Sequence, residues 1–200
     1  MKHELPHFYI GDSYGGNQGW FPTFMMRIGG CGAETACDSS IYFSLHRGLT
    51  DIAPENAAGL SKEDYIHFAY EMKPYLSPRM SGIDRLDIFT EGYEKYLDDR
   101  GEKRLKMAAL NGSEPYEAAH DAVIQQINNG YPIPTLILNH RNKALSDYVW
   151  HWFMINGYDD TNGRFLVKAV TYSKFEWLDF QQLWNTGHER RGGLVLFHLD

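Results

Sequence analysis

The sequence places a cysteine where a thiol can become reactive. Gly29 and Gly30 precede Cys31, and the residues after it follow helical spacing, so the sulfur is expected in the first turn of a helix. Free backbone N–H groups and the positive end of the helix dipole lie there, and both favour the nucleophilic thiolate. Gly32 follows directly and leaves room for a substrate beside the sulfur. Cys31 is therefore the candidate nucleophile.

The second cysteine, Cys37, has a different setting. It lies a turn and a half into the same helix, about 240° around from Cys31. Cys37 is best interpreted as a small buried apolar residue of the core. On one helix the two Cα atoms would be about 9 Å apart along the axis, beyond the ~7 Å reach of a disulfide. Both thiols are expected to be free, and two cysteines are too few for a four-thiolate zinc site.

A cysteine nucleophile needs a base, and His151 is the candidate. It begins an aromatic and apolar run that ends at Tyr158 and is typical of a strand buried on both faces. A histidine between two tryptophans at the edge of such a strand has a shielded position and a tunable pKa. A core histidine satisfied by a backbone hydrogen bond is the alternative. The other eight histidines have no context that separates them from surface or packing roles.

Helices dominate the first two thirds of the chain. Residues 1–30 are rich in glycine and aromatics and are typical of loop and turn. A helix is expected from about Cys31 to His46, ending before Gly48, and the region of about 50–130 has a helical pattern throughout. Three serines mark expected helix starts within it: Ser61, Ser81 and Ser113.

From Tyr131 onward the period shifts to two, which indicates strands. The turn sequence from Asp159 to Gly163 predicts an antiparallel hairpin. A short helix is expected at Leu178–Leu183. The expected strands are Thr135–Asn139, Trp150–Tyr158, Gly163–Val170 and Gly193–His198. Helices and strands segregate along the chain, so the expected class is α+β.

Composition narrows the function classes. With 43% hydrophobic and 22% charged residues the chain is typical of a globular protein, and 200 residues suit a single domain, 1–200. The net charge of −7 argues against a nucleic-acid partner. No apolar run reaches the ~20 residues that cross a bilayer, and Met1–His7 lacks the apolar core of a secretion signal, so a cytoplasmic location is expected. Neither a phosphate-binding loop nor a zinc-spaced histidine pair is present, so no cofactor or metal is expected.

Several runs resemble a known family. Gly30-Cys31-Gly32-Ala33-Glu34-Thr35-Ala36 looks like the nucleophile helix of papain-like cysteine peptidases, in particular of the branch that processes bacteriocin leaders. Gly130-Tyr131-Pro132-Ile133-Pro134 and then His151 to Asp159 follow that branch's order of Gly-x-Pro strand, His strand and Gly-Tyr-Asp turn. Asp179 to Trp184 matches the helix that usually follows. The matches cover about 17–47 and 129–198, so about 50–129 looks like a helical insertion.

The resemblance implies a papain-like fold, with a nucleophile helix packed on an antiparallel sheet, and a thiolate–imidazolium pair of Cys31 and His151. It also implies an upstream amide that stabilises the oxyanion together with the Cys31 N–H. Gln18 is the natural candidate and Asn17 the second choice. Gln18 lies thirteen residues before Cys31, whereas the family usually places this residue about half a dozen before, where Met25 stands here.

A second departure concerns the group that orients the imidazole. The family uses an Asp or Asn at the end of the strand after the His strand, and Ala169 stands about there. Thr171, Ser173, Asp179 or a backbone carbonyl could replace it. Asp159 and Asp160 are better explained by the hairpin turn.

Two functions follow from these residues. The first is cysteine-dependent hydrolysis or acyl transfer at an amide or thioester carbonyl of a peptide, an acyl carrier or a small amide. The second is a catalytically silent papain-like module that binds a peptide or acyl-carrier partner, which the missing orienting residue motivates. The sequence gives no indication of the oligomeric state.

Overall fold

The computed structural model describes all 200 residues, and its centre is one sheet of seven strands whose pairings are all antiparallel. Six strands follow the order β4-β9-β5-β6-β7-β8, and β1 pairs with β6. The strands are β1 (Lys2–Glu4), β4 (Leu105–Asn111), β5 (Ile133–Ile137), β6 (His151–Asp159), β7 (Leu166–Thr171), β8 (Lys174–Asp179) and β9 (Gly193–Leu199). The α+β class expected from the sequence is confirmed.

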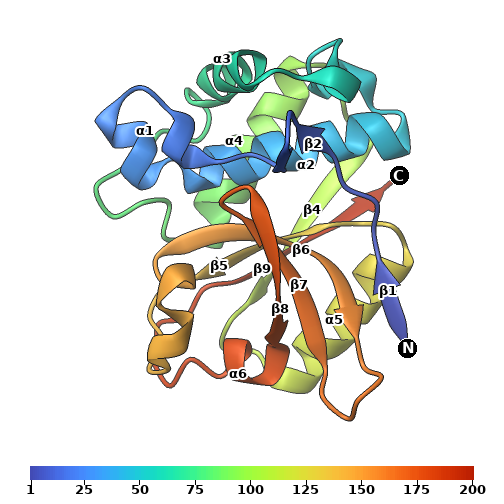
Figure 1. The fold of residues 1–200 in the computed structure, drawn as a ribbon, viewed down its shortest axis with the longest axis vertical. Coiled ribbons are helices and arrows are strands. Elements are labelled where there is room, and N and C mark those ends of the chain that lie inside the picture. Colours follow the sequence, from blue (N-terminus) through green and yellow to red (C-terminus); the bar gives the residue numbers. More distant parts are fainter.

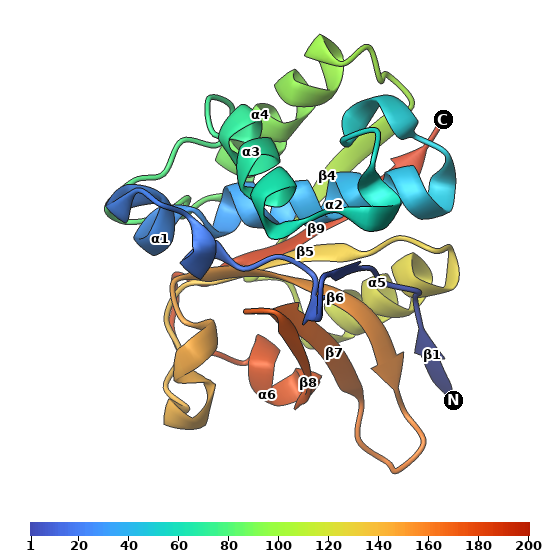
Figure 2. The ribbon, with the colours of Figure 1, turned by 45° about the horizontal axis from the view of Figure 1, so that its top comes forward.

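Helices cover both faces of this sheet (Figures 1 and 2). On one face α2 lies against the sheet, with α1, α3 and α4 around it, whereas α5 and α6 lie on the other face. The helices are α1 (Phe24–Gly29), α2 (Cys31–Arg47), α3 (Lys62–Met72), α4 (Leu86–Asp99), α5 (Tyr116–Asn128) and α6 (Phe180–Trp184). No helix combines the length and the apolar character that crossing a membrane would need.

The smaller elements fill the connections between these parts. The two short strands β2 and β3 form a hairpin of their own, separate from the main sheet. The 3-10 helix η1 precedes α1, and η4 leads into β6. These elements are β2 (Tyr9–Ile10), β3 (Ser13–Tyr14), η1 (Gln18–Trp20), η2 (Thr50–Ile52), η3 (Ala57–Gly59) and η4 (Lys143–Tyr148).

Helix α2 is the central helix of the fold and is buried from Cys31 through Phe43. A helix buried on all sides shows no amphipathic stripe. Small residues along α2 let the neighbouring elements pack closely against it on every side. It ends as expected, because Gly48 adopts the left-handed conformation at φ 72° and its N–H bonds the Phe43 carbonyl. The predicted helix of Cys31–His46 is therefore confirmed to within one residue.

Other predicted elements are confirmed with small shifts. Ser61 caps α3 in a capping box with Asp64. Helix α5 begins at Tyr116, three residues after Ser113, and Ser113 does not cap it: its hydroxyl donates to Asn111, and Pro115, expected in the first turn, precedes the helix. The four predicted strands correspond to β5, β6, β7 and β9, and β6 and β7 form the predicted hairpin. The predicted helix at Leu178–Leu183 corresponds to α6, which starts two residues later because the strand β8 extends to Asp179.

Three expectations were wrong. Residues 1–30 are not only loop, since they contain three short strands and α1. The region of about 50–130 is not helical throughout, because β4 pairs along its whole length with β9. Leu105 to Leu110 consists largely of good helix formers, and the sheet partner overrides that preference. Finally, Ser81 does not start a helix: it lies in an irregular segment, and α4 begins at Leu86.

Candidate active site

Cys31 is the first residue of α2, as predicted, and its side chain is buried with an exposed fraction of 2%. The backbone N–H groups of Cys31 itself, Gly32 and Trp152 lie close enough to the sulfur to lower its pKa. The first two belong to the helix N-terminus and the third to strand β6. The sulfur therefore lies at the contact between α2 and β6, beside the residue that follows His151.

His151 is the first residue of β6 and is 3% exposed. Its Nε2 lies 2.7 Å from Oγ1 of Thr171 on the neighbouring strand β7. Its ring stacks on Tyr172, with 4.7 Å between centroids and 3° between planes. The Tyr172 hydroxyl lies 3.5 Å from the other ring nitrogen, Nδ1. Both nitrogens thus face groups from the end of β7.

Thr171 is one of the groups that the sequence left open as a substitute for the missing Asp or Asn. Ala169, at the expected position, pairs with Ile155 across the β6–β7 ladder. Alternate residues of a strand share a face, so Thr171 points to the same side as Ala169, two residues further along. Its hydroxyl reaches His151, whereas Asp179 accepts the Gln182 N–H at the start of α6. Asp159 accepts from Thr161 in the turn, as expected.

Gln18 lies beside α2, but its amide is partly engaged. Its backbone N–H donates to Glu34, one turn after Cys31, and its Nε2 donates to the carbonyl of Arg27 at 2.9 Å. The side-chain Oε1 is buried without a partner. Helix α1 accounts for the extra residues between Gln18 and Cys31, because it fills the loop that returns to α2. Asn17, the second choice, donates to the Ser173 hydroxyl instead.

The segment 77–85 covers the start of α2, and sequence reasoning missed this. A methyl group on Gly29 would lie 2.5 Å from the Arg79 carbonyl oxygen, and one on Gly32 would lie 3.0 Å from Cδ1 of Ile83. The Trp152 indole N–H donates to the Ile83 carbonyl at 2.6 Å. The space that Gly32 leaves is therefore filled by Ile83, and not open to a substrate as the sequence suggested.

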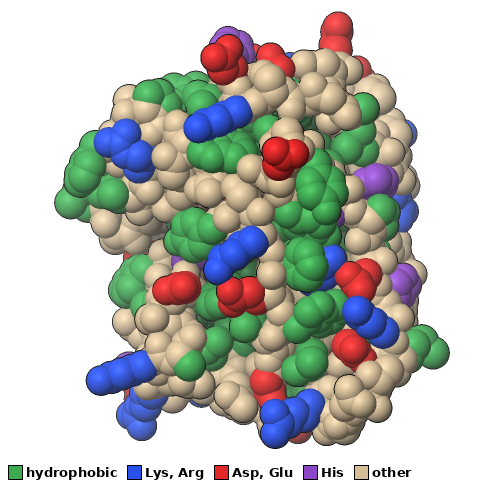
Figure 3. Space-filling model, viewed as in Figure 1, with side chains coloured by type: hydrophobic (Ala, Val, Ile, Leu, Met, Phe, Trp, Pro, Cys, Tyr) green, Lys and Arg blue, Asp and Glu red, His purple; other side chains and the backbone are tan.

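A shallow hollow of about 310 Å³ lies over this region. It is lined by Ile28 of α1, Met80, Ser81 and Gly82 of the covering segment, and Trp150. Ile28, Met80 and Trp150 are all exposed, and so is Phe24 of α1. Apolar side chains gather over α1 at the left edge of the face in Figure 3. An exposed apolar surface thus borders the covered cysteine.

Burial sets the protonation of the two candidate residues. Desolvation raises the pKa of Cys31 to about 11, against the smaller lowering by the three backbone N–H groups. Desolvation also lowers the pKa of His151 to about 4. The expectation that the helix N-terminus favours the thiolate is therefore wrong for this closed conformation, in which a neutral thiol and a neutral imidazole are the stable forms.

Cys37 is fully buried and, like Cys31, is not in a disulfide, as predicted. Burial raises the pKa of its thiol as well, and the carboxyl of Asp38 adds to the effect. No three or more His, Cys, Asp or Glu side chains are grouped so that they could hold a metal ion.

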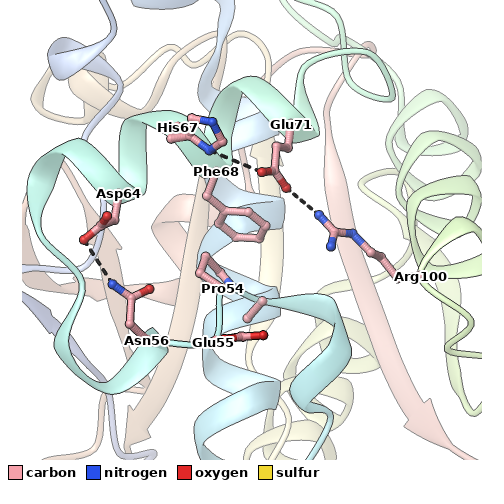
Figure 4. Close-up of a pocket in the computed structure, with 9 residues that line it drawn as sticks. Pro54, Glu55, Asn56, Asp64, His67, Phe68, Glu71 and Arg100 are labelled. Carbon is pink, nitrogen blue, oxygen red and sulfur yellow. Dashed lines mark hydrogen bonds and ion pairs between the residues drawn. The ribbon is translucent and has the colours of Figure 1, made fainter.

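A separate hollow of about 280 Å³ lies on α3 and is shown in Figure 4. Its polar groups pair with one another: Glu71 contacts His67 and Arg100, and Asn56 donates to Asp64. No cysteine lines it, and neither candidate residue contributes to it. Cys31 and His151 therefore lie apart from this hollow, where α2 meets β6. No family model, no curated protein and no solved structure matches this chain.

Proposed function

We propose that this chain is a cysteine-dependent hydrolase or acyltransferase of papain-like fold that acts on an amide or thioester carbonyl. The observation that supports it is the meeting of α2 and β6. The backbone N–H of Trp152, the residue after His151, lowers the pKa of the sulfur at the first residue of α2, and the Thr171 hydroxyl lies 2.7 Å from Nε2 of that imidazole. A nucleophile, a base and a group that orients the base are the parts that such chemistry requires.

Backbone strain supports the same location. Only three residues other than glycine have a positive φ: Trp150 at 53°, Tyr172 at 51° and Ser173 at 64°. Trp150 directly precedes His151, and the other two follow Thr171. Such conformations cost about 1 kcal/mol or more and tend to cluster at functional sites, where the surroundings hold them in place. All three border the candidate base and its partner.

The proposed reaction begins with proton transfer from Cys31 to Nδ1 of His151, the nitrogen that Thr171 leaves free. The thiolate attacks the carbonyl carbon, and the negative oxygen that forms is stabilised by the Cys31 N–H and by Gln18. The C–N or C–S bond then breaks, and His151 returns the proton to the departing amine or thiol. Water or another nucleophile takes the acyl group from the sulfur and regenerates the thiol.

The covering segment must move before this reaction can occur. In the closed conformation the thiol pKa of about 11 and the imidazole pKa of about 4 oppose the proton transfer. Both shifts arise first from burial, so exposing the two side chains to water lowers the thiol pKa and raises the imidazole pKa. Substrate entry from the hollow beside Trp150 would therefore also activate the pair.

The burial of Cys31 also favours a second candidate function. A chain in which segment 77–85 never opens would be a silent module that binds a peptide or acyl-carrier partner on its surface. The exposed apolar side chains around the hollow suit such a role. Reactivity of Cys31 separates the two functions.

The test uses p-nitrophenyl acetate, an activated acyl donor, and mass spectrometry of the whole chain and its peptides. The proposal expects release of p-nitrophenol with an acetyl group on Cys31. Cys31→Ala abolishes this acylation, His151→Asn slows it at least a hundredfold, and the matched variant Cys37→Ala retains it. Acetylation that spares Cys31, or that is equally fast without His151, overturns the proposed function and leaves the silent module.

A further inference from the structure

Tyr172 contacts the candidate base with both its ring and its hydroxyl. Its ring lies parallel to the imidazole of His151 at 4.7 Å, and its hydroxyl is 3.5 Å from Nδ1. Thr171, the preceding residue, faces Nε2. Two consecutive residues therefore hold the same imidazole, one from an edge and one from a face.

The backbone at Tyr172 is unusual for an aromatic residue. Tyr172 and Ser173 form the two-residue turn between β7 and β8, since Thr171 pairs with Lys174. Both have positive φ, the conformation for which such turns strongly favour Asn-Gly. A bulky side chain at the first position strains the backbone, so we expect an interaction of the Tyr172 ring to offset that strain.

The amino-terminal segment holds this turn from the other side. The Ser173 N–H donates to the Gly16 carbonyl, and the Tyr14 N–H donates to the Ser173 carbonyl. The Asn17 amide donates to the Ser173 hydroxyl at 3.1 Å. Because three hydrogen bonds fix Ser173, the ring of Tyr172 is held over His151.

The phenol of Tyr172 also interacts electrostatically with Cys31. Burial raises the pKa of Tyr172 to about 12, and the next contribution is the negative charge that Cys31 would carry as a thiolate. The ring thus stacks on His151 and is coupled by charge to Cys31, from outside the helix and the strand that carry them.

We propose that Tyr172 is a positioning residue for His151. The ring of Tyr172 fixes the orientation of the imidazole by stacking on it, and the hydroxyl of Tyr172 favours one tautomer of the imidazole. This inference rests on the proposed cysteine chemistry. In a neutral imidazole one nitrogen donates and the other accepts. With Nε2–H donating to Thr171, Nδ1 carries the lone pair and accepts from the Tyr172 hydroxyl. That is the tautomer which can take a proton from Cys31 once the Tyr172 hydroxyl turns away from Nδ1, since this nitrogen has a single lone pair.

The test separates the ring from the hydroxyl with Tyr172→Phe and Tyr172→Leu. The matched control is Tyr42→Phe. Tyr42 lies on α2, eleven residues after Cys31, and its hydroxyl donates to the Gly130 carbonyl. One readout is the tautomer of His151 from its imidazole ¹⁵N shifts, which does not depend on activity. The other is the pH profile of Cys31 acylation by p-nitrophenyl acetate.

Wild type and Tyr42→Phe should both show His151 protonated on Nε2 alone at pH 7. Tyr172→Phe should give a mixture of tautomers and about fivefold slower acylation, the loss of one modest hydrogen bond. Tyr172→Leu should be slower still, with a shifted pH profile. If Tyr172→Phe and Tyr172→Leu both keep the wild-type tautomer and the wild-type rate, the inference about Tyr172 is overturned and the proposed function is not. If His151→Asn acylates Cys31 as fast as wild type, the proposed function itself is overturned.

Discussion

The hydroxyl oxygen of Thr171 lies 2.7 Å from Nε2 of His151, across the ladder between β7 and β6. In the proposed papain-like site this contact replaces the Asp or Asn that the resemblance implies. A hydroxyl is a weaker partner for an imidazolium than a carboxylate, since it carries no charge. The contact nevertheless fixes which nitrogen is left for Cys31.

Replacement of Thr171 by valine keeps the shape and removes the hydroxyl. We expect Cys31 acylation to slow about tenfold, because the buried Nε2–H of His151 loses its partner. Thr171→Ser is the matched control and should retain most of the rate. Stopped-flow release of p-nitrophenol measures both, and equal rates in the valine and serine variants would show that the hydroxyl does not orient the imidazole.

Gln18 can be tested by comparing two reactions of the same sulfur. Acylation builds a negative oxygen, but alkylation by iodoacetamide does not. If Gln18 stabilises that oxygen, Gln18→Ala slows acylation by about a hundredfold and leaves alkylation unchanged. Gln126→Ala is the matched control for acylation, because this buried glutamine of α5 likewise donates its amide N–H to a backbone carbonyl, that of Phe197, away from the site. Loss of both reactions in Gln18→Ala would instead mean that its bond to Arg27 supports the structure around Cys31.

The covering segment gives a prediction about access. Ile83 is buried on the start of α2, and moving the segment exposes it. Ile83→Ala removes most of that apolar contact, worth roughly 2 kcal/mol, so Cys31 should be alkylated at least tenfold faster at pH 8.

Met80→Ala is the control for this access experiment, because Met80 lines the same hollow but is 78% exposed. Peptide mapping also follows Cys37, whose labelling reports general unfolding. An unchanged Cys31 rate in Ile83→Ala, or parallel acceleration of Cys37, would rule out local opening of segment 77–85.

His7 gives a prediction about stability and pH. The residue is half-buried, its ring lies against Phe8 and Tyr14, and both ring nitrogens are buried without a partner. Burial lowers its pKa from 6.5 to about 3, and the charge of Lys168 adds to the effect. Between these pH values the unfolded chain binds a proton that the folded chain does not. Falling pH therefore destabilises the fold by up to about 1.4 kcal/mol per unit for this group.

His7→Phe should lose less stability than wild type as the pH falls from 6.5 to 4. Urea unfolding at several pH values measures this, and the exposed His67→Ala is the control. The raised pKa of Asp38, about 7, gives the opposite pH trend, but both proteins contain it. A constant difference between wild type and His7→Phe over this range would show that His7 is protonated in the folded chain.

The sequence predicted the positions of Cys31 and His151 well because local signals define them. Glycines before Cys31 and small residues after it indicate the start of a buried helix, and apolar residues around His151 indicate a buried strand. Ser61 and the turn after Asp159 are equally local, and both were confirmed. Such features need no knowledge of the distant partner.

The features that the sequence did not predict depend on pairing between distant residues. Nothing around Leu105 distinguishes a helix from a strand until β9 lies beside it. The partner of His151 could not be narrowed to Thr171, because residues two apart along β7, such as Ala169 and Thr171, point to the same face. Only the structure shows which of them reaches the imidazole. The contact between Ile83 and Gly32 was missed because an irregular segment has no periodicity that would place it.

The closed segment over Cys31 also bears on chemical damage. Peroxides oxidise thiolates much faster than thiols, and they need access to the sulfur. In this structure the sulfur is buried and its raised pKa keeps it protonated, so a dissolved oxidant meets neither a thiolate nor an accessible sulfur. Exposure to peroxide should therefore spare the resting chain and inactivate it mainly during turnover, when the segment has moved away.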